Sequence, residues 1–190
     1  MHTYFDILCD KYGNPYFTDA EKDTLLNRAQ LSFVDQVVQQ AETNDNILNK
    51  ISTLIVSGTA VQMSSSGEVT VSAVATATGV TPYKVLKVYE DGVGAVSQVS
   101  HNNSGPARSN YFKAQRRRFE QLGTKWLFYP ISTTASLVFT VIAYPTTITK
   151  GSSNSNIPDL SHNEIVAQAI NLAGIATRDE ALAQLNQMNK

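Results

Sequence analysis

The chain has 190 residues, of which 42% are hydrophobic and 16% charged. This length suits one domain with its own core and argues against two large domains. Lysine and arginine number 15 against 16 acidic residues, so the net charge of −1 provides no overall attraction to nucleic acid or to a membrane surface. The single cysteine, Cys9, excludes an intrachain disulfide, and no cysteine–histidine cluster indicates structural zinc.

Uncharged polar residues are unusually frequent in this chain. Ser, Thr, Asn and Gln together make up roughly a third of it, above ordinary usage. The first residues lack the basic and apolar regions of a secretory leader, and no apolar run approaches the roughly 20 residues that span a bilayer. We therefore expect a chain made in the cytosol, without a membrane partner, whose surface carries hydroxyls and amides more than charges.

Three helix starts are predicted by a hydroxyl residue followed three positions later by glutamate, because each side chain can accept a hydrogen bond from the other residue's backbone amide. The pairs are Thr18 with Glu21, Ser161 with Glu164, and Thr177 with Glu180. The start at Ser161 has a further feature, since Leu160 and Ile165 are spaced to form a hydrophobic staple.

The first half of the chain predicts an antiparallel pair of helices. From Thr18 to about Ala41, apolar residues recur at helical spacing; they are Leu26, Ala29, Phe33 and Val37, with Leu31, Val34 and Val38 widening the stripe. After a polar turn at residues 44–46, a second and shorter helix is expected to end before Ser57 and Gly58.

The middle of the chain predicts strands. Alternation over residues 69–75, a β-branched run at 85–89 and a turn at 91–92 before 93–99 indicate strands and a hairpin. Residues 126–129 and 137–144 flank a polar loop and are interpreted as a second hairpin. Residues 111–121 are expected to form a short helix.

After the strands, the composition of residues 151–156 is that of a mobile linker. The helix that starts at Ser161 carries an apolar face and is expected to stop at Gly174. A last helix places Leu182, Leu185 and Met188 on one stripe.

Together these elements predict an α+β fold in which helices from both chain ends form a bundle that carries a β-rich central insertion. Residues 1–60 are assigned to an N-terminal arm and helical hairpin. Residues 61–150 are assigned to the β-rich middle of the same domain, and residues 151–190 to the linker and the C-terminal helices.

The densest charge in the chain is the basic stretch, defined here as Lys113, Arg116, Arg117 and Arg118. On a helix, Glu120 can pair with Arg116 or Arg117, which favours a solvated and partly paired face. The alternative is a local site for phosphate or for an acidic protein surface. With Tyr111 and Phe112 beside it, the stretch also fits a module that binds single-stranded nucleic acid.

No set of residues predicts catalysis, a metal site or a cofactor. Asp159, His162 and Glu164 are explained by a helix start, and Cys9 with His101 lacks any group that lowers a thiol pKa. Gly92 and Gly94 lie in a hairpin turn without the helix that a phosphate loop needs. We therefore expect that the protein is not an enzyme.

The aromatic residues near the N-terminus allow two interpretations. Tyr4, Phe5, Tyr12, Tyr16 and Phe17 either pack within the chain, the favoured interpretation, or form an arm that reaches a neighbouring subunit. If subunits assemble, the candidate contacts are Tyr4, Phe5, Ile165, Val166, Leu182 and Leu185.

Three stretches of the chain together resemble the head-to-tail connector (adaptor or ring) proteins of tailed bacteriophages, in particular those of short-tailed, crAss-like phages. They are residues 17–33 (FTDAEKDTLLNRAQLSF), 138–145 (VFTVIAYP) and 157–169 (IPDLSHNEIVAQA). They cover about a fifth of the chain, and the resemblance lies in their order more than in any one motif.

The resemblance implies a subunit of a ring, commonly a dodecamer, in the virion neck. Its partners would be copies of itself, the portal protein, other neck or tail proteins, and the packaged DNA in the channel. The chain would reside in the virion, and in the host cytoplasm during assembly. The basic stretch would face either that DNA or an acidic portal surface, and no catalysis is implied.

Overall fold

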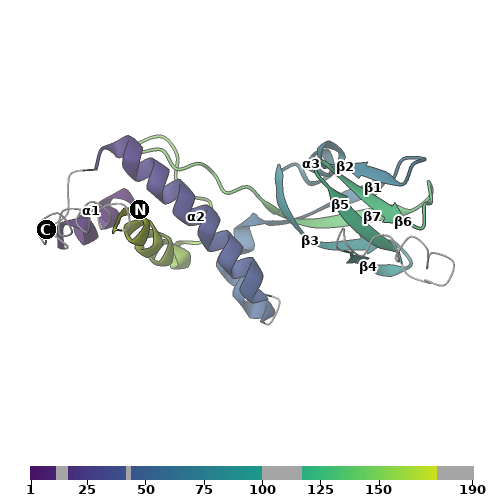
Figure 1. Ribbon diagram of the computed structural model, residues 1–190, viewed down its shortest axis with the longest axis horizontal. Helices are drawn as coiled ribbons and strands as arrows, with labels where there is room; N and C mark the ends of the chain where they lie inside the picture. The colour runs from purple at the N-terminus through teal and green to yellow at the C-terminus, as the bar shows by residue number, and fades with distance from the viewer. Residues whose placement is uncertain (12–16, 42–43, 100–116, 175–190) are drawn as a thin grey trace, which may run out of the picture. The chain divides into compact units, whose positions relative to one another are not determined.

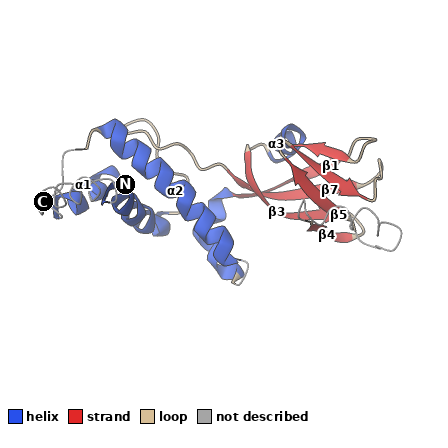
Figure 2. Cartoon of the chain, viewed as in Figure 1, coloured by secondary structure: helices blue, strands red, loops and turns tan. Residues whose placement is uncertain are grey.

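The computed structural model describes residues 1–11, 17–41, 44–99 and 117–174. The chain divides into two compact units. The helical unit comprises Met1–Thr53 and Pro145–Lys190, and the sheet unit comprises Leu54–Tyr144. Figure 2 shows which segments are helices (blue) and which are strands (red).

The helical unit contains α1 (His2–Lys11), α2 (Asp19–Ala41), the 3-10 helix η1 (Asp45–Leu54), the short 3-10 turn η4 (Asp159–Ser161) and a helix over residues 162–174. Among the described residues, no helix combines the length and the apolar composition that crossing a bilayer requires. The helix over residues 162–174 lies beside α2, since Gln168 Nε2 donates to Gln36 Oε1 at 2.6 Å.

The predicted apolar stripe of α2 is confirmed for five residues, which are buried: Leu26, Ala29, Phe33, Val34 and Val37. Leu31 and Val38 are half-buried, and the polar Gln30 is buried as well. The predicted second helix is present as η1, with two differences. It has 3-10 geometry with a kink at Ile51 (φ −126°, ψ 22°), and strand β1 begins directly after it at Ile55.

The predicted helix starts have different outcomes. At Thr18 the reciprocal cap is confirmed: the Thr18 amide donates to Glu21 Oε2 at 2.7 Å and the Glu21 amide donates to Thr18 Oγ1 at 3.3 Å. At Ser161 the predicted cap is wrong, because Ser161 Oγ donates to the Lys50 carbonyl and Glu164 pairs with Lys50 Nζ at 2.5 Å. Leu160 is 92% exposed and forms no staple. Thr177 and Glu180 lie outside the described residues.

In its described residues, the sheet unit contains seven strands in the order β1-β7-β3-β4-β5-β6-β2, curled into a half-barrel (Figure 1). All neighbouring strands are antiparallel except β4 and β5. Their bounds are β1 (Ile55–Gln62), β2 (Glu68–Thr70), β3 (Pro82–Glu90), β4 (Gly94–Gln98), β5 (Arg118–Leu122), β6 (Lys125–Tyr129) and β7 (Ser136–Ala143).

The hairpin predicted around residues 91–92 is confirmed as the β3–β4 turn, with Gly92 at φ +72°. The second predicted hairpin is wrong in its pairing. β6 pairs with β5 and β2, whereas β7 pairs with β1 and β3. Apolar alternation identifies a strand, but the pairing depends on which strands bury the shared core, and β7 is a central strand with two neighbours.

The alternation over residues 69–75 does not form one strand. β2 ends at Thr70, and α3 (Val71–Thr78) follows, with the Ala73 amide donating to Thr70 Oγ1 at 3.2 Å as its N-cap. Gly79 closes the helix in the left-handed conformation. A cap at each end and one buried residue, Val74, fix a helix that the period-two pattern missed.

The end of α3 packs on Gly58 inside β1. A Cβ atom at this position would lie 2.8 Å from the Thr78 side chain and 3.0 Å from the Ala77 carbonyl oxygen. Gly58 therefore lies within a strand and not at the end of a helix. Its missing side chain permits close approach of α3 to β1.

The sheet unit has an aromatic core. Trp126 and Phe128 of β6, Phe139 of β7 and Phe119 of β5 are each at most 4% exposed. Their rings are in contact, with centroids 5.4 Å apart for Trp126 and Phe139 and 5.5 Å apart for Phe119 and Phe128. Strands from distant parts of the chain thus share one set of rings.

The predicted α+β fold class, a helical bundle formed by both chain ends with a β-rich insertion, is wrong. The described residues form a mixed α/β fold with a seven-stranded curled sheet. Helical periodicity predicts individual helices, but it does not say which layer forms the framework. The strands also start earlier than expected, because β1 begins at Ile55, within residues assigned to the N-terminal arm and helical hairpin.

Candidate functional site

The basic stretch is only partly within the described residues. Lys113 and Arg116 lie outside them, as do Tyr111 and Phe112. Arg118 starts β5 and is exposed. The helix expected over residues 111–121 is therefore wrong for residues 118–121, which lie in strand β5.

Arg117 is a buried structural residue. Its Nε donates to Glu90 Oε2 at 2.7 Å and its Nη2 donates to Glu90 Oε1 at 2.8 Å, while Nη1 donates to the Pro130 carbonyl. Arg117 is 8% exposed and Glu90 is 6% exposed. This bidentate pair joins β3 to the residues between β6 and β7 and neutralises both charges. Arg117 is thus not part of an exposed patch.

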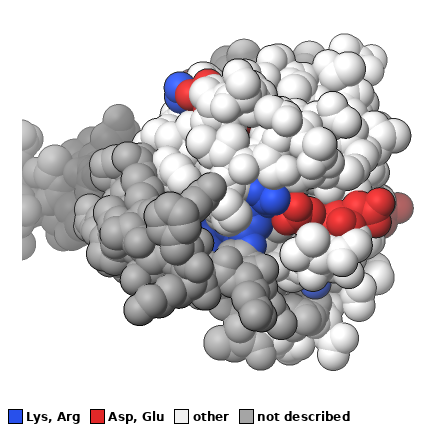
Figure 3. Space-filling view, turned by 90° about the vertical axis from the view of Figure 1, so that its right-hand side faces the viewer, with Lys and Arg blue, Asp and Glu red and all other residues white. Residues whose placement is uncertain are grey.

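Charges near this pair are balanced. Glu120, expected to pair with Arg117 or Arg116 along a helix, is instead buried within β5 at 1% exposure. Figure 3 shows acidic and basic atoms beside one another on the described part of this face, with mostly uncharged atoms around them. The described part of this face therefore carries acidic as well as basic side chains.

Of the four predicted assembly contacts within the described residues, three are interior. Phe5, Ile165 and Val166 are 0% exposed, so within this chain they are core residues and not surface contacts. Phe5 packs edge-to-face on Phe17, with ring centroids 5.9 Å apart, in agreement with the favoured interpretation that these aromatics pack within the chain. Tyr4 is 40% exposed. Leu182 and Leu185 lie outside the described residues.

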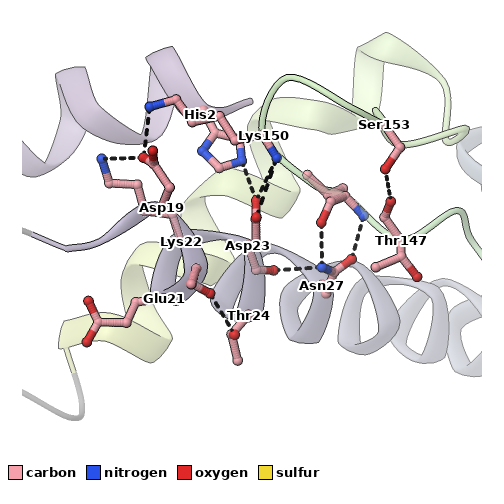
Figure 4. Close-up of polar contacts among 12 residues, drawn as sticks. His2, Asp19, Glu21, Lys22, Asp23, Thr24, Asn27, Thr147, Lys150 and Ser153 are labelled. Carbon is pink, nitrogen blue, oxygen red and sulfur yellow. Dashed lines mark hydrogen bonds and ion pairs between the residues drawn. The ribbon is translucent and has the colours of Figure 1, made fainter.

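A polar clasp, formed by Asp23, Asn27 and Gln30 of α2, holds the extended chain after β7. Asn27 Oδ1 accepts from the Ile148 amide at 2.8 Å and its Nδ2 donates to the Ile148 carbonyl at 2.9 Å. Gln30 Nε2 donates to the Thr146 carbonyl at 2.9 Å. Figure 4 shows Asp23 and Asn27 directed from α2 toward this segment.

The clasp continues into the stretch interpreted as a mobile linker. Ser155 Oγ donates to Gln30 Oε1 at 3.0 Å, and Asn156 Oδ1 accepts from the Thr146 amide at 2.8 Å. Lys150 Nζ donates to Asp19 Oδ1 at 2.8 Å, which lowers the pKa of the Asp19 carboxyl. The small polar residues thus fix the segment. The feature of the sequence that could have predicted this clasp is the set of polar residues at positions 23, 27 and 30, which share one face of a helix.

The residues considered for catalysis form no reaction centre in the described part of the chain. His162 Nδ1 lies 3.3 Å from Asp159 Oδ1, and His162 Nε2 lies 2.9 Å from the Ile157 carbonyl oxygen. Both contacts of His162 are explained by the turn before its helix. His101 lies outside the described residues. No group of three or more His, Cys, Asp or Glu side chains is arranged to hold a metal ion in the described ranges.

A pocket of about 290 Å³ lies in the sheet unit where the first half of β3 faces the β5–β6 turn. We call it the tyrosine pocket. Its lining comprises Val71, Thr81, Pro82, Tyr83, Lys84, Val85, Gln121, Gly123, Thr124, Trp126 and Tyr144. The Val71 amide donates to the Thr124 carbonyl and the Tyr144 amide to the Thr81 carbonyl, so the backbone on two sides of the pocket is fixed.

Two tyrosines and a lysine give the tyrosine pocket its chemistry. Tyr83 and Tyr144 pack edge-to-face with centroids 4.8 Å apart, and Lys84 Nζ lies 5.6 Å from the centroid of the Tyr83 ring. Tyr144 is 51% exposed. Sequence reasoning missed this pocket. The signal was at the ends of two predicted strands, because Tyr83 and Lys84 directly precede the run at 85–89 and Tyr144 ends the strand predicted at 137–144.

Comparison with known proteins does not assign the chain to a family. A scan against protein-family models gave no match, and a search of curated proteins gave none either.

Proposed function

We propose that this chain is a structural subunit of a phage virion neck, a ring or adaptor protein that joins the portal to the tail around the DNA channel. Such a subunit needs surfaces that bind other proteins without charge repulsion. The sequence resemblance suggested this role, and one end of the sheet unit supports it.

The observation that carries the proposal is a set of exposed apolar side chains at that end. Tyr89 and Val93 at the β3–β4 turn are 54% and 56% exposed, and Ile131, after β6, is 45% exposed. The Arg117–Glu90 pair and the Pro130 carbonyl connect the two segments that carry them. Exposed apolar groups held on a rigid support are typical of protein-binding surfaces.

The polar composition also supports this role. When an interface closes, desolvating hydroxyls and amides costs less free energy than desolvating charged groups. In its loop, Ile131 is followed by three hydroxyl residues, Ser132, Thr133 and Thr134. The hydroxyls of Ser132 and Thr134 lie 3.1 Å apart. We expect the isolated chain to be a monomer or weak oligomer that forms an ordered ring on a portal template.

Cryo-electron microscopy of particles from a phage that encodes this chain tests the proposal. We expect density for the chain between portal and tail, with residues 89, 93 or 131 at a subunit contact. Density elsewhere in the particle contradicts it. The double variant Val93→Asp with Ile131→Asp should lower incorporation at least tenfold, whereas Thr133→Asp, an added charge on an exposed residue of the same loop, should not.

A second candidate, single-stranded nucleic-acid binding by residues 111–118, loses Arg117 to the buried pair with Glu90. Of its basic residues, Arg118 is the one that the described chain shows as exposed. Retention of the purified chain on a single-stranded DNA column at low salt, abolished by Arg118→Met, would favour this candidate instead.

A further inference from the structure

The sheet leaves room for a ligand beside the first half of β3. β3 pairs with β7 along the whole length of β3, whereas β3 pairs with β4 only at residues 88–90. β4 then meets β5 at residues 97 and 98. The tyrosine pocket occupies the space between the earlier residues of β3 and the β5–β6 turn, within the sheet unit.

The walls of the pocket suit one flat ring. Tyr144 is half exposed, and its ring is supported edge-to-face by Tyr83. A tyrosine ring held in this way loses little conformational freedom when another ring stacks on it. A volume of about 290 Å³ lies at the small end of ligand pockets, which span roughly 300 to 1,000 Å³. The pocket therefore fits one ring with its substituents rather than an extended chain.

The charge of the pocket selects an anion. Lys84 is the ionised residue among its lining residues, and the described lining contains no Asp or Glu. Because Lys84 Nζ lies 5.6 Å from the Tyr83 ring, the cation and the aromatic surface are within the span of one small molecule. Gln121 and Thr124 place an amide and a hydroxyl at the same pocket.

We propose that the tyrosine pocket binds a nucleotide, with the base against Tyr144, the phosphate at Lys84, and Gln121 and Thr124 available to the base edge. An acidic peptide side chain offers an anion to Lys84 but no flat ring to the tyrosines, whereas a nucleotide offers both an anion and a ring. The bound unit is either a free mononucleotide or one residue of a single strand. This inference does not depend on the neck role, since its site is distinct from residues 89, 93 and 131.

The single tryptophan of the chain, Trp126, lines the pocket, so its fluorescence reports occupancy. The probes are thymidine monophosphate and an eight-residue oligothymidylate, titrated into the full chain at low salt. We expect saturable quenching. Tyr144→Ala should weaken binding about tenfold or more through lost stacking. Lys84→Met should weaken it and reduce the salt slope for the oligonucleotide by about 0.7.

Two matched controls separate this site from others. Lys87→Met and Tyr89→Ala remove the same residue types from exposed positions of β3 that do not line the pocket, and both should leave binding unchanged. Circular dichroism confirms folding, and Lys84→Met keeps the test valid if Tyr144→Ala does not fold. Tighter binding of the oligonucleotide than of the monophosphate identifies a single strand as the ligand, and equal binding identifies the free nucleotide.

Three results would overturn the proposal. The first is no quenching by either probe up to millimolar concentration. The second is binding that Arg118→Met abolishes and Lys84→Met leaves unchanged, which places the ligand on β5. The third is binding of an acidic peptide that quenches Trp126 while neither nucleotide probe does.

Discussion

Arg117→Met is the substitution that most directly tests the structural role assigned to Arg117. It removes the partner of Glu90, which is 6% exposed, and leaves the Pro130 carbonyl without its guanidinium donor. Removing one member of a buried pair costs about 3–5 kcal/mol, because the remaining charge stays buried without compensation. Methionine keeps most of the apolar volume of the arginine stem, so the loss reports the charge and the hydrogen bonds.

The assay is urea unfolding followed by the fluorescence of Trp126, which is in the core of the same sheet unit. The control is Arg118→Met on the adjacent, exposed position of β5, with an expected change within about 0.5 kcal/mol. The double variant Glu90→Gln with Arg117→Met should recover part of the loss, since no unpaired charge remains. Equal effects of the Arg117 and Arg118 substitutions would refute the assignment of Arg117 to a buried pair.

Three further predictions concern stability. Asn27→Ala should cost about 1–3 kcal/mol, because the amide and carbonyl of buried Ile148 lose their partner; an unchanged urea midpoint by circular dichroism contradicts the clasp. Lys150 lowers the pKa of the Asp19 carboxyl in the folded state. The stabilisation from this ion pair is therefore present at neutral pH and is lost as pH falls below about 4. Asp19→Asn should flatten this part of the stability profile, and an unaltered profile counts against the contact. Gly58→Ala should cost about 1–3 kcal/mol by forcing the end of α3 away, and a neutral result in thermal unfolding would show that α3 moves freely.

Local features of the chain were predictable because neighbouring residues determine them. The cap formed by Thr18 with Glu21 and the buried stripe of α2 depend on spacings of three and four along one helix. The β3–β4 hairpin depends on a turn with glycine at residue 92 and on the apolar runs beside it. For these features the sequence pattern and the structure carry the same information.

Only the tertiary structure decided which elements meet. The sequence predicts strands at residues 126–129 and 137–144 that pair with each other. In the structure β6 pairs with β5 and β2, and β7 pairs with β1 and β3, because burial of the aromatic core selects the pairing. Likewise, Arg117 is part of a basic stretch in the sequence, but in the structure its guanidinium pairs with Glu90, a residue 27 positions away. The tyrosine pocket has the same origin, since its residues come from α3, β3, β5, β6 and the end of β7. Contacts between distant segments depend on the packing of the whole sheet, and no local spacing encodes them.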